Sequence, residues 1–280
     1  MTSIDFDALW DFQDAAGSER RFREAAETES DTEARAVLLT QLARALGLQG
    51  RFDEGHTVLD EAAGLLATPS DELSVRVLLE RGRLFNSGGD PIRAKGLFLE
   101  AFELAVAAGL DALAVDAAHM VAIAETGEAS QEWNFRALEI AESSSEPKAQ
   151  RWKASLYNNI GWNFHEEGRY EEALAAFLTA LDLRREQGTA RARQIAEWCV
   201  ARCLRSLGRY EEALRMQERL VEADPEDSYV HEEVGECLLA LGRVEEAKRA
   251  FARAYDLLSA DPAAVERDAE RLERLKRLAT

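Results

Sequence analysis

A six-residue pattern that closes one helix and opens the next recurs in this chain and sets its architecture. It reads Gly-Arg-Tyr-Glu-Glu-Ala at 168–173 and at 208–213, and Gly-Arg-Val-Glu-Glu-Ala at 242–247. Glycine commonly ends a helix, and acidic side chains are favoured in the first turn of the next one. The pattern therefore predicts a tight turn between two helices at each of these places.

The most complete helix pair surrounds the first of these turns, over 154–187. Before the turn Leu156, Ile160 and Phe164 recur at a helical period, and after it Phe177 belongs to a second apolar stripe. Neither helix is able to bury its stripe alone. The two are therefore predicted to pack against each other as an antiparallel pair.

Position for position, this pair resembles the tetratricopeptide repeat. The matching residues are Tyr157, Ile160, Gly161, Phe164, Gly168, Tyr170, Ala173, Phe177 and Ala180. The resemblance implies an all-α fold, a right-handed α-solenoid of antiparallel helix pairs with about six repeats and with capping helices at both ends. The remaining repeats are expected over 36–66, 75–105, 110–142, 194–225 and 228–261. The pattern is degenerate in the one at 110–142.

The expected organisation has an N-terminal capping element at 1–30, three front repeats at 31–145, three back repeats at 146–261 and a C-terminal capping helix at 262–280. Residues 143–147 interrupt the helical pattern and form the expected joint between the front and back halves. Within the capping elements we expect a short helix that begins at a Ser18 cap, and one amphipathic helix over 263–278.

Composition excludes several classes of partner. The net charge of -19 argues against a nucleic-acid backbone or an anionic membrane, because both require a basic face. No apolar run approaches the roughly 20 residues of a membrane span. The N-terminal sequence is acidic where a secretory signal would be basic and then apolar, and an odd number of cysteines fits a reducing compartment. The expected location is the cytoplasm.

Residues that carry catalysis or bind metals do not form a recognisable set in the sequence. Cys199, Cys203 and Cys237 fall within amphipathic helices, and they are interpreted as buried small side chains rather than as a zinc site, which needs about four close ligands. The histidines are scattered, and no nucleophile has a base at a fitting spacing. We therefore expect no catalytic residues, no metal and no cofactor.

In the resembled family, the first helices of successive repeats line a concave groove, and ligands touch residues beside the packing stripe. Carried over to this sequence, the second, fifth, ninth and twelfth places of the first helices include Arg44, Arg76, Arg83, Asn86, His119, Asn158, Trp162, His165, Trp198, Arg202 and Arg205. Trp162 has two interpretations, an anchor for a partner or a packing residue against the preceding repeat. The arginines favour a carboxylate-rich ligand, because guanidinium groups bind carboxylates bidentately.

The resulting hypothesis is a non-enzymatic scaffold or adaptor that binds an extended peptide or protein segment in the groove. Its expected anchors are Trp162, Trp198, Arg202 and Arg205. The alternative is a self-associating structural module, in which the apolar cluster around Trp10 docks onto a neighbouring copy. The oligomeric state stays open between the two hypotheses.

Overall fold

The computed structural model describes residues 6–280, and every regular element among them is a helix. The predicted all-α fold of packed helix pairs is confirmed. The chain forms two compact units, unit 1 (Met1–Leu156) and unit 2 (Tyr157–Thr280). The division falls between Leu156 and Tyr157, inside a helix. It lies about ten residues, or roughly three helical turns, beyond Pro147, where the expected joint ends.

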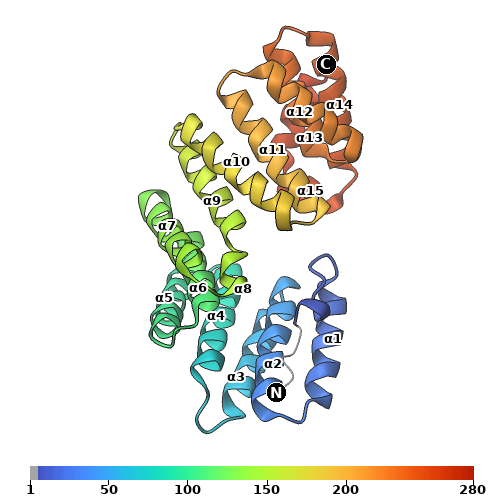
Figure 1. Ribbon diagram of the computed structural model, residues 1–280. Coiled ribbons are helices and arrows are strands. Elements are labelled where there is room, and N and C mark those ends of the chain that lie inside the picture. Colours follow the sequence, from blue (N-terminus) through green and yellow to red (C-terminus); the bar gives the residue numbers. More distant parts are fainter. Residues whose placement is uncertain (1–5) are drawn as a thin grey trace. The chain divides into compact units, whose positions relative to one another are not determined.

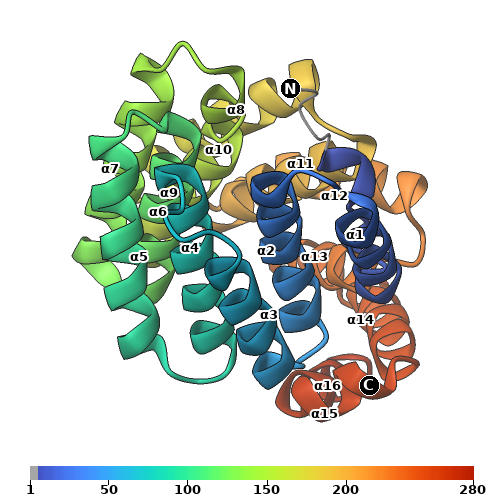
Figure 2. The ribbon, with the colours of Figure 1, turned by 90° about the horizontal axis from the view of Figure 1, so that it is seen from below.

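Unit 1 is a series of helical hairpins (Figures 1 and 2). Its elements are η1 (Asp7–Leu9), α1 (Ala15–Thr28), α2 (Thr32–Leu48), α3 (Phe52–Gly64), α4 (Asp71–Ser87), α5 (Pro91–Ala107), α6 (Asp111–Ala124), α7 (Gly127–Ser143) and α8 (Pro147–Gln150). The hairpins are α2 with α3, α4 with α5, and α6 with α7, and α4 also packs against α2 and α6. The first helices of successive hairpins are therefore neighbours.

Unit 2 continues the same arrangement. Its elements are α9 (Lys153–Glu166), in which the division falls, α10 (Tyr170–Gln187), α11 (Ala190–Ser206), α12 (Tyr210–Ala223), α13 (Ser228–Ala240), α14 (Val244–Ser259), α15 (Pro262–Arg267) and α16 (Ala269–Leu278). Consecutive helices from α10 to α14 pack on one another, and α11 also touches α13. The helix ends agree with the turns that the sequence predicts.

The recurring six-residue pattern has a physical reason for most of its letters. Gly208 has a φ of 76°, a left-handed conformation that favours glycine. Arg209 donates through Nε and Nη2 to the Glu212 carboxylate, both at 2.8 Å, while Ala213 is fully buried against the neighbouring helices. The same contacts recur at the other two copies of the pattern. The exposed ion pair adds little stability, so glycine and alanine carry most of the turn.

The helices of a pair approach most closely where glycine on the first faces phenylalanine on the second. A Cβ atom on Gly161 would lie 2.6 Å from Cε1 of Phe177. At the corresponding places the chain has Gly82–Phe98, Gly161–Phe177 and Gly235–Phe251 in alternate repeats, and Ala43–Leu59, Ala118–Asn134 and Ala201–Gln217 in the others. Where the first helix has alanine instead of glycine at this position, the second helix has a side chain smaller than phenylalanine at the facing position. The side chains at the two positions therefore fill the same space.

The Ala201–Gln217 pair places a polar group in this core. Gln217 is 0% exposed, and neither atom of its amide has a hydrogen-bond partner within the described part of the chain. Burying an unpaired amide lowers stability. Leu59 has the corresponding position in the first repeat. Replacing Gln217 by leucine is expected to raise the free energy of unfolding by about 1–2 kcal/mol. A lower urea midpoint for this variant would contradict the packing described here.

The N-terminal helix differs from the sequence expectation in its start. The Asp14 side chain caps α1 by accepting a hydrogen bond from Gly17 N at 2.8 Å. Ser18 lies one turn further on, fully buried, where its hydroxyl bonds to the backbone of Asp11. The predicted Ser18 cap is therefore wrong, because the cap lies four residues earlier, at Asp14, and the Ser18 hydroxyl instead holds the preceding loop.

The C-terminal segment also differs from the expected single helix over 263–278. It consists of α15 and α16, which are separated at Asp268. Ala264 of α15 and Leu272 and Leu275 of α16 are buried in the core of unit 2, where α16 packs on α14.

Candidate partner-binding surface

The candidate residues lie on the first helices of the pairs, at repeating places, which are counted within each repeat from residues 36, 75, 111, 154, 194 and 228. The ninth place holds Arg44, Arg83, His119, Trp162, Arg202 and Glu236, and the sixth place holds Gln41, Glu80, Asp116, Asn159, Cys199 and Glu233. In each unit, an arginine at the ninth place pairs with the carboxylate at the sixth place of the next first helix. These pairs join neighbouring repeats.

In unit 1 the central member of the series is Arg83. Its guanidinium lies 2.6 Å from Glu80 and 2.5 Å from Asp116, and all three side chains are largely buried. Burial alone would raise the pKa of Asp116, but the charges of Arg83 and Arg44 lower it below its usual value. Arg44 is 3.9 Å from Glu80 and lies over the rings of Trp10 and Phe12.

In unit 2 a single buried acid holds two of the predicted anchors. Glu233 is 6% exposed and accepts from Arg205 through both oxygens, at 2.7 and 3.1 Å. Arg202 Nε lies 3.1 Å from the same carboxylate. The two guanidinium groups that we expected to grip a partner's carboxylate already have an internal one.

Trp162 occupies the ninth place of its repeat, on α9, and is partly buried against the core of unit 2. Its ring centroid lies 5.1 Å from that of Phe177 and 6.1 Å from that of Trp198, so it contacts its own repeat and the following one. The sequence interpretation had only the preceding repeat as a packing neighbour. Trp198 lies beside it on the neighbouring helix, as the sequence predicts.

The predicted histidines and Asn158 are not among the residues that line the two cavities described below. His165 Nε2 is 2.8 Å from the hydroxyl of Ser206, and burial together with the charges of Arg202 and Arg205 lowers the pKa of His165. In unit 1 the ring of His119 packs 5.1 Å from that of Trp152. Asn158 is half-buried on α9.

Three of the predicted residues meet at one cavity of unit 1. The cavity measures about 230 Å³ and is lined by Arg44, Gly47, Leu48, Glu80, Arg83, Leu84, Asn86, Ser87, Met120 and Ile123. Leu48 and Ile123 are half-exposed. The cavity therefore combines apolar walls with a set of charges that pair among themselves.

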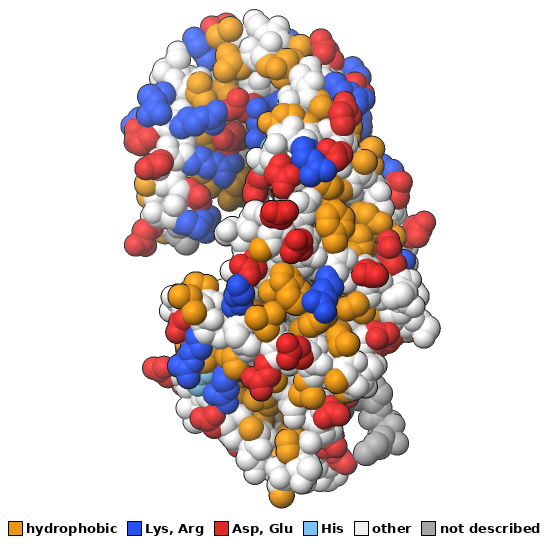
Figure 3. All heavy atoms as spheres, turned by 90° about the vertical axis from the view of Figure 1, so that its left-hand side faces the viewer, with side chains coloured by type: hydrophobic (Ala, Val, Ile, Leu, Met, Phe, Trp, Pro, Cys, Tyr) orange, Lys and Arg blue, Asp and Glu red, His pale blue; other side chains and the backbone are white. Residues whose placement is uncertain are grey.

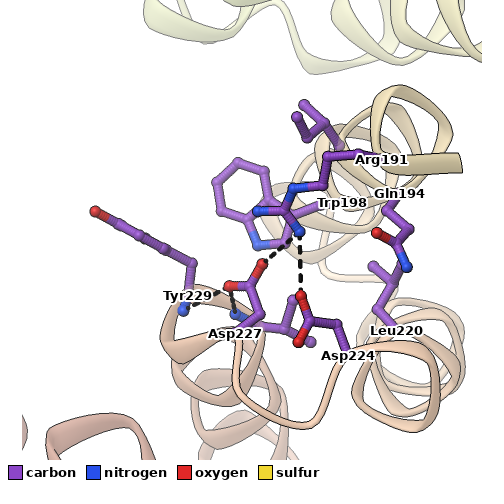
Figure 4. Close-up of a pocket in the computed structure, with 9 residues that line it drawn as sticks. Arg191, Gln194, Trp198, Leu220, Asp224, Asp227 and Tyr229 are labelled. Atoms are coloured by element: carbon purple, nitrogen blue, oxygen red, sulfur yellow. Dashed lines mark hydrogen bonds and ion pairs between the residues drawn. The ribbon is translucent and has the colours of Figure 1, made fainter. Parts of the chain in front are cut away.

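A second cavity, in unit 2, includes the predicted Trp198. It measures about 270 Å³ and is lined by Arg191, Gln194, Ile195, Trp198, Leu220, Asp224, Asp227, Tyr229 and Val230 (Figure 4). Ile195 is 49% exposed and Tyr229 is 40% exposed, although both are large and apolar. The Trp198 Nε1 atom is buried and has no hydrogen-bond partner among residues 6–280. We call this cavity the Trp198 pocket.

Sequence reasoning missed most of the Trp198 pocket. Ile195 and Tyr229 stand at the second place of successive first helices, where the only predicted candidate was Arg76. An apolar residue at a place that the packing stripe does not use was the available signal. Asp224 and Asp227 belong to the loop before α13, and a helix pattern alone does not locate a loop.

A charged group crosses the Trp198 pocket. Arg191 Nη1 lies 3.4 Å from Asp224 Oδ2 and 3.2 Å from Asp227 Oδ2. In Figure 4 the Arg191 side chain reaches toward both carboxylates beside the Trp198 indole, and the Tyr229 ring points away from them. The arginine comes from α11 and the acids from the loop between α12 and α13, so this contact again joins neighbouring repeats.

The N-terminal cluster that supports the self-association hypothesis is partly used within unit 1. Trp10 Nε1 donates to Gln41 Oε1 at 3.1 Å, and its ring packs edge-on against Phe22. Phe12 stacks on Trp10 and remains 61% exposed. The cluster therefore fixes the N-terminal segment to α2 and leaves one aromatic face to solvent.

The cysteines are buried and protonated. Burial raises the pKa of the Cys199 thiol to about 12, that of Cys203 to about 11 and that of Cys237 to about 12. Over the described range 6–280, no group of histidine, cysteine and acidic side chains is placed to hold a metal ion. Within that same range, no helix has both the length and the apolar surface that crossing a bilayer requires.

Charged side chains of both signs lie close together on the face that Figure 3 shows. Figure 3 shows one face of the molecule, on which acidic and basic side chains are interspersed with hydrophobic groups between them. This agrees with the many ion pairs between neighbouring helices and within single turns. On this face the acidic excess of the chain is spread out rather than gathered in one patch.

Comparison with protein families supports the resemblance. Two models described as tetratricopeptide repeat match the back half, one over residues 164–232 and one over 201–264. No curated protein sequence matches the chain.

Solved structures share the fold at low sequence identity. The apo form of RapI has a TM-score of 0.70 and 13% identity, over 92% of this chain and 75% of that one. A STAND ATPase with a tetratricopeptide repeat sensor from Pyrococcus horikoshii has a TM-score of 0.71 and 13% identity, over 96% of this chain but only 44% of that one. NprR in complex with its cognate peptide NprX has a TM-score of 0.58 and 16% identity, over 97% and 80%.

Proposed function

Because this chain is a helical repeat protein with tetratricopeptide repeats, we propose that it is an interaction scaffold that holds an extended segment of a partner protein on the first helices of unit 2. The Trp198 pocket supplies the main anchor point, and binding involves no chemical step. Trp162 supports Trp198 from the adjacent helix, and Glu233 fixes Arg202 and Arg205 beside them.

The observation that carries this proposal is the unfilled apolar surface around Trp198. Large apolar side chains in a recess are the usual energetic anchors of an interface. Ile195 and Tyr229 each leave about half of their surface in water, which a folded core normally avoids for neighbouring apolar groups. A side chain of a partner would cover the exposed parts of Ile195 and Tyr229.

A similar fold is known with a peptide bound, since the structure of NprR contains its cognate peptide NprX. At 16% identity the likeness concerns the fold, and it supports the class of ligand only in the general sense of a peptide. The proposal for the ligand of this chain is therefore argued from the residues of the Trp198 pocket.

The proposal is tested by selecting binders from a random-peptide display library against the immobilised full-length protein. Replacing Ile195 by aspartate puts a charge at the wall of the Trp198 pocket and is expected to weaken the selected peptides about tenfold or more. Fluorescence polarisation with labelled peptides measures the change. If the selected peptides bind this variant as well as they bind the wild type, the pocket is not the anchor point.

The matched control is Leu178→Asp in the same unit. Leu178 is 43% exposed, close to the 49% of Ile195, but it does not line the Trp198 pocket. Its substitution is expected to leave peptide affinity within about twofold of the wild type. Light scattering on the wild type and on Ile195→Asp tests whether a second copy of the chain occupies the pocket, since that form of self-association predicts a change in mass without any peptide.

A further inference from the structure

The two carboxylates at the Trp198 pocket are held in place by backbone contacts. Asp227 Oδ1 accepts hydrogen bonds from Tyr229 N at 3.0 Å and Val230 N at 3.3 Å, which caps α13, and the Asp227 side chain is 12% exposed. Asp224 Oδ1 accepts from Glu226 N at 3.3 Å. Each aspartate thus uses one oxygen for the loop and turns the other to Arg191.

The arginine between them is held less firmly. The Arg191 side chain is 57% exposed and stands in the first turn of α11, at the end of a flexible stem. By contrast, Arg83 in its buried pair is 14% exposed. Exposed ion pairs contribute little to stability, because water competes for both partners. Two fixed anions and one exchangeable cation are the result.

The balance of charge at this place is acidic. Asp224, Glu226 and Asp227 all belong to the loop before α13, and Asp224 and Asp227 line the pocket together with Arg191. Arg271 lies 4.1 Å from the centre of the Tyr229 ring, and Glu232 pairs with it. Arg202 and Arg205 on α11 do not alter this balance, because Glu233 already pairs with both of them. An added cation would be attracted here, whereas an added carboxylate would meet the two aspartates.

We propose that the Trp198 pocket receives a partner segment in which a large apolar side chain stands next to an arginine or lysine. The apolar side chain fills the space between Ile195, Trp198 and Tyr229. The partner's cation takes the position of Arg191 between Asp224 and Asp227, and Arg191 moves into solvent. This inference rests on the proposed function, and it adds the chemical class of the segment.

The test varies one residue in a peptide selected on the full-length protein. The residue beside the apolar anchor of that peptide is made arginine, glutamine or glutamate, and each version is measured by fluorescence polarisation. The arginine version is expected to bind tightest and the glutamate version weakest, with about threefold or more between neighbours in the series. The variant Arg191→Gln removes the internal competitor, so it is expected to bind the arginine version about threefold to tenfold more tightly than the wild type.

A second variant keeps the fold and removes the charge. Asp227→Asn retains a side-chain oxygen that caps α13, because asparagine is among the preferred N-cap residues. It is expected to bind the arginine and glutamine versions equally, while Asp224→Asn reduces the difference between them. These variants separate charge recognition from loss of structure.

The outcomes distinguish this inference from the proposed function. If wild type binds the glutamate version best and Arg191→Gln abolishes that preference, Arg191 itself reads an acidic partner and the inference is wrong. Equal affinity for all three versions, with Ile195→Asp still weakening them, would leave the apolar anchor and refute the basic neighbour. If Ile195→Asp does not weaken the binding of the selected peptides, both the proposed function and this inference are wrong. If Ile195→Asp changes the mass of the protein without peptide, a second copy occupies the pocket and both are also wrong.

Discussion

Replacing Glu233 by glutamine is expected to lower the free energy of unfolding by about 2–3 kcal/mol. Glutamine keeps the shape of the side chain but removes the charge that neutralises Arg202 and Arg205, which lie 3.1 and 2.7 Å from it. Both arginines are at least three-quarters buried, so water replaces the lost carboxylate only in part. Urea denaturation followed by circular dichroism measures the loss.

The matched control is Glu212→Gln, the same substitution in an exposed pair. Glu212 is 45% exposed and lies 2.8 Å from Arg209 within one helical turn. Its replacement is expected to change stability by less than about 0.5 kcal/mol. Equal losses of stability for the two variants would contradict the conclusion that Arg202 and Arg205 join neighbouring repeats through buried charge pairs.

Replacing Gly161 by alanine is expected to destabilise unit 2 by about 2 kcal/mol. The new Cβ would lie 2.6 Å from the ring of Phe177, which is 1% exposed and has no free space to move into. Alanine is ordinarily the better helix former, so the sign of the effect identifies the contact. At Gly96, where an added Cβ meets no atom within 4 Å, the same substitution is expected to be neutral or stabilising.

The double variant Gly161→Ala with Phe177→Leu tests whether the two positions share one volume. It recreates the pair that the first repeat has at Ala43 and Leu59. The combined loss is expected to be smaller than the sum of the two single losses, because the leucine makes room for the new methyl group. Strictly additive losses would show that the glycine is needed for another reason.

The fold was predictable because its determinants are local. The glycine at 208, with its φ of 76°, and the alanine that packs behind it are five residues apart, and both recur with the repeat. What the pattern did not locate were the two ends, where tertiary contacts decide. Ser18 lies inside the helix and bonds to the loop before it, and the helix is interrupted at Asp268 although the apolar stripe runs on.

The candidate surface was predictable in part. The neighbouring positions of Trp162 and Trp198 follow from the repeat, and they are observed. The arginines were expected to be free because each helix was considered alone. Their acids stand at the sixth place of the next repeat, as with Arg202 and Glu233, and a pattern within one repeat does not contain that pair. The pocket also depends on the loop conformation that places Asp227 beside α11.

Fluorine NMR of the full-length protein labelled with 5-fluorotryptophan measures directly whether a bound segment covers Trp198. The chain has five tryptophans, so each gives a separate resonance that a single Trp→Phe variant assigns. On titration with a library-selected peptide, we expect a large shift for Trp198, a smaller one for Trp162 and little change for Trp10, Trp133 and Trp152. Binding that shifts Trp10 or Trp133 and leaves Trp198 unchanged would contradict the proposed function.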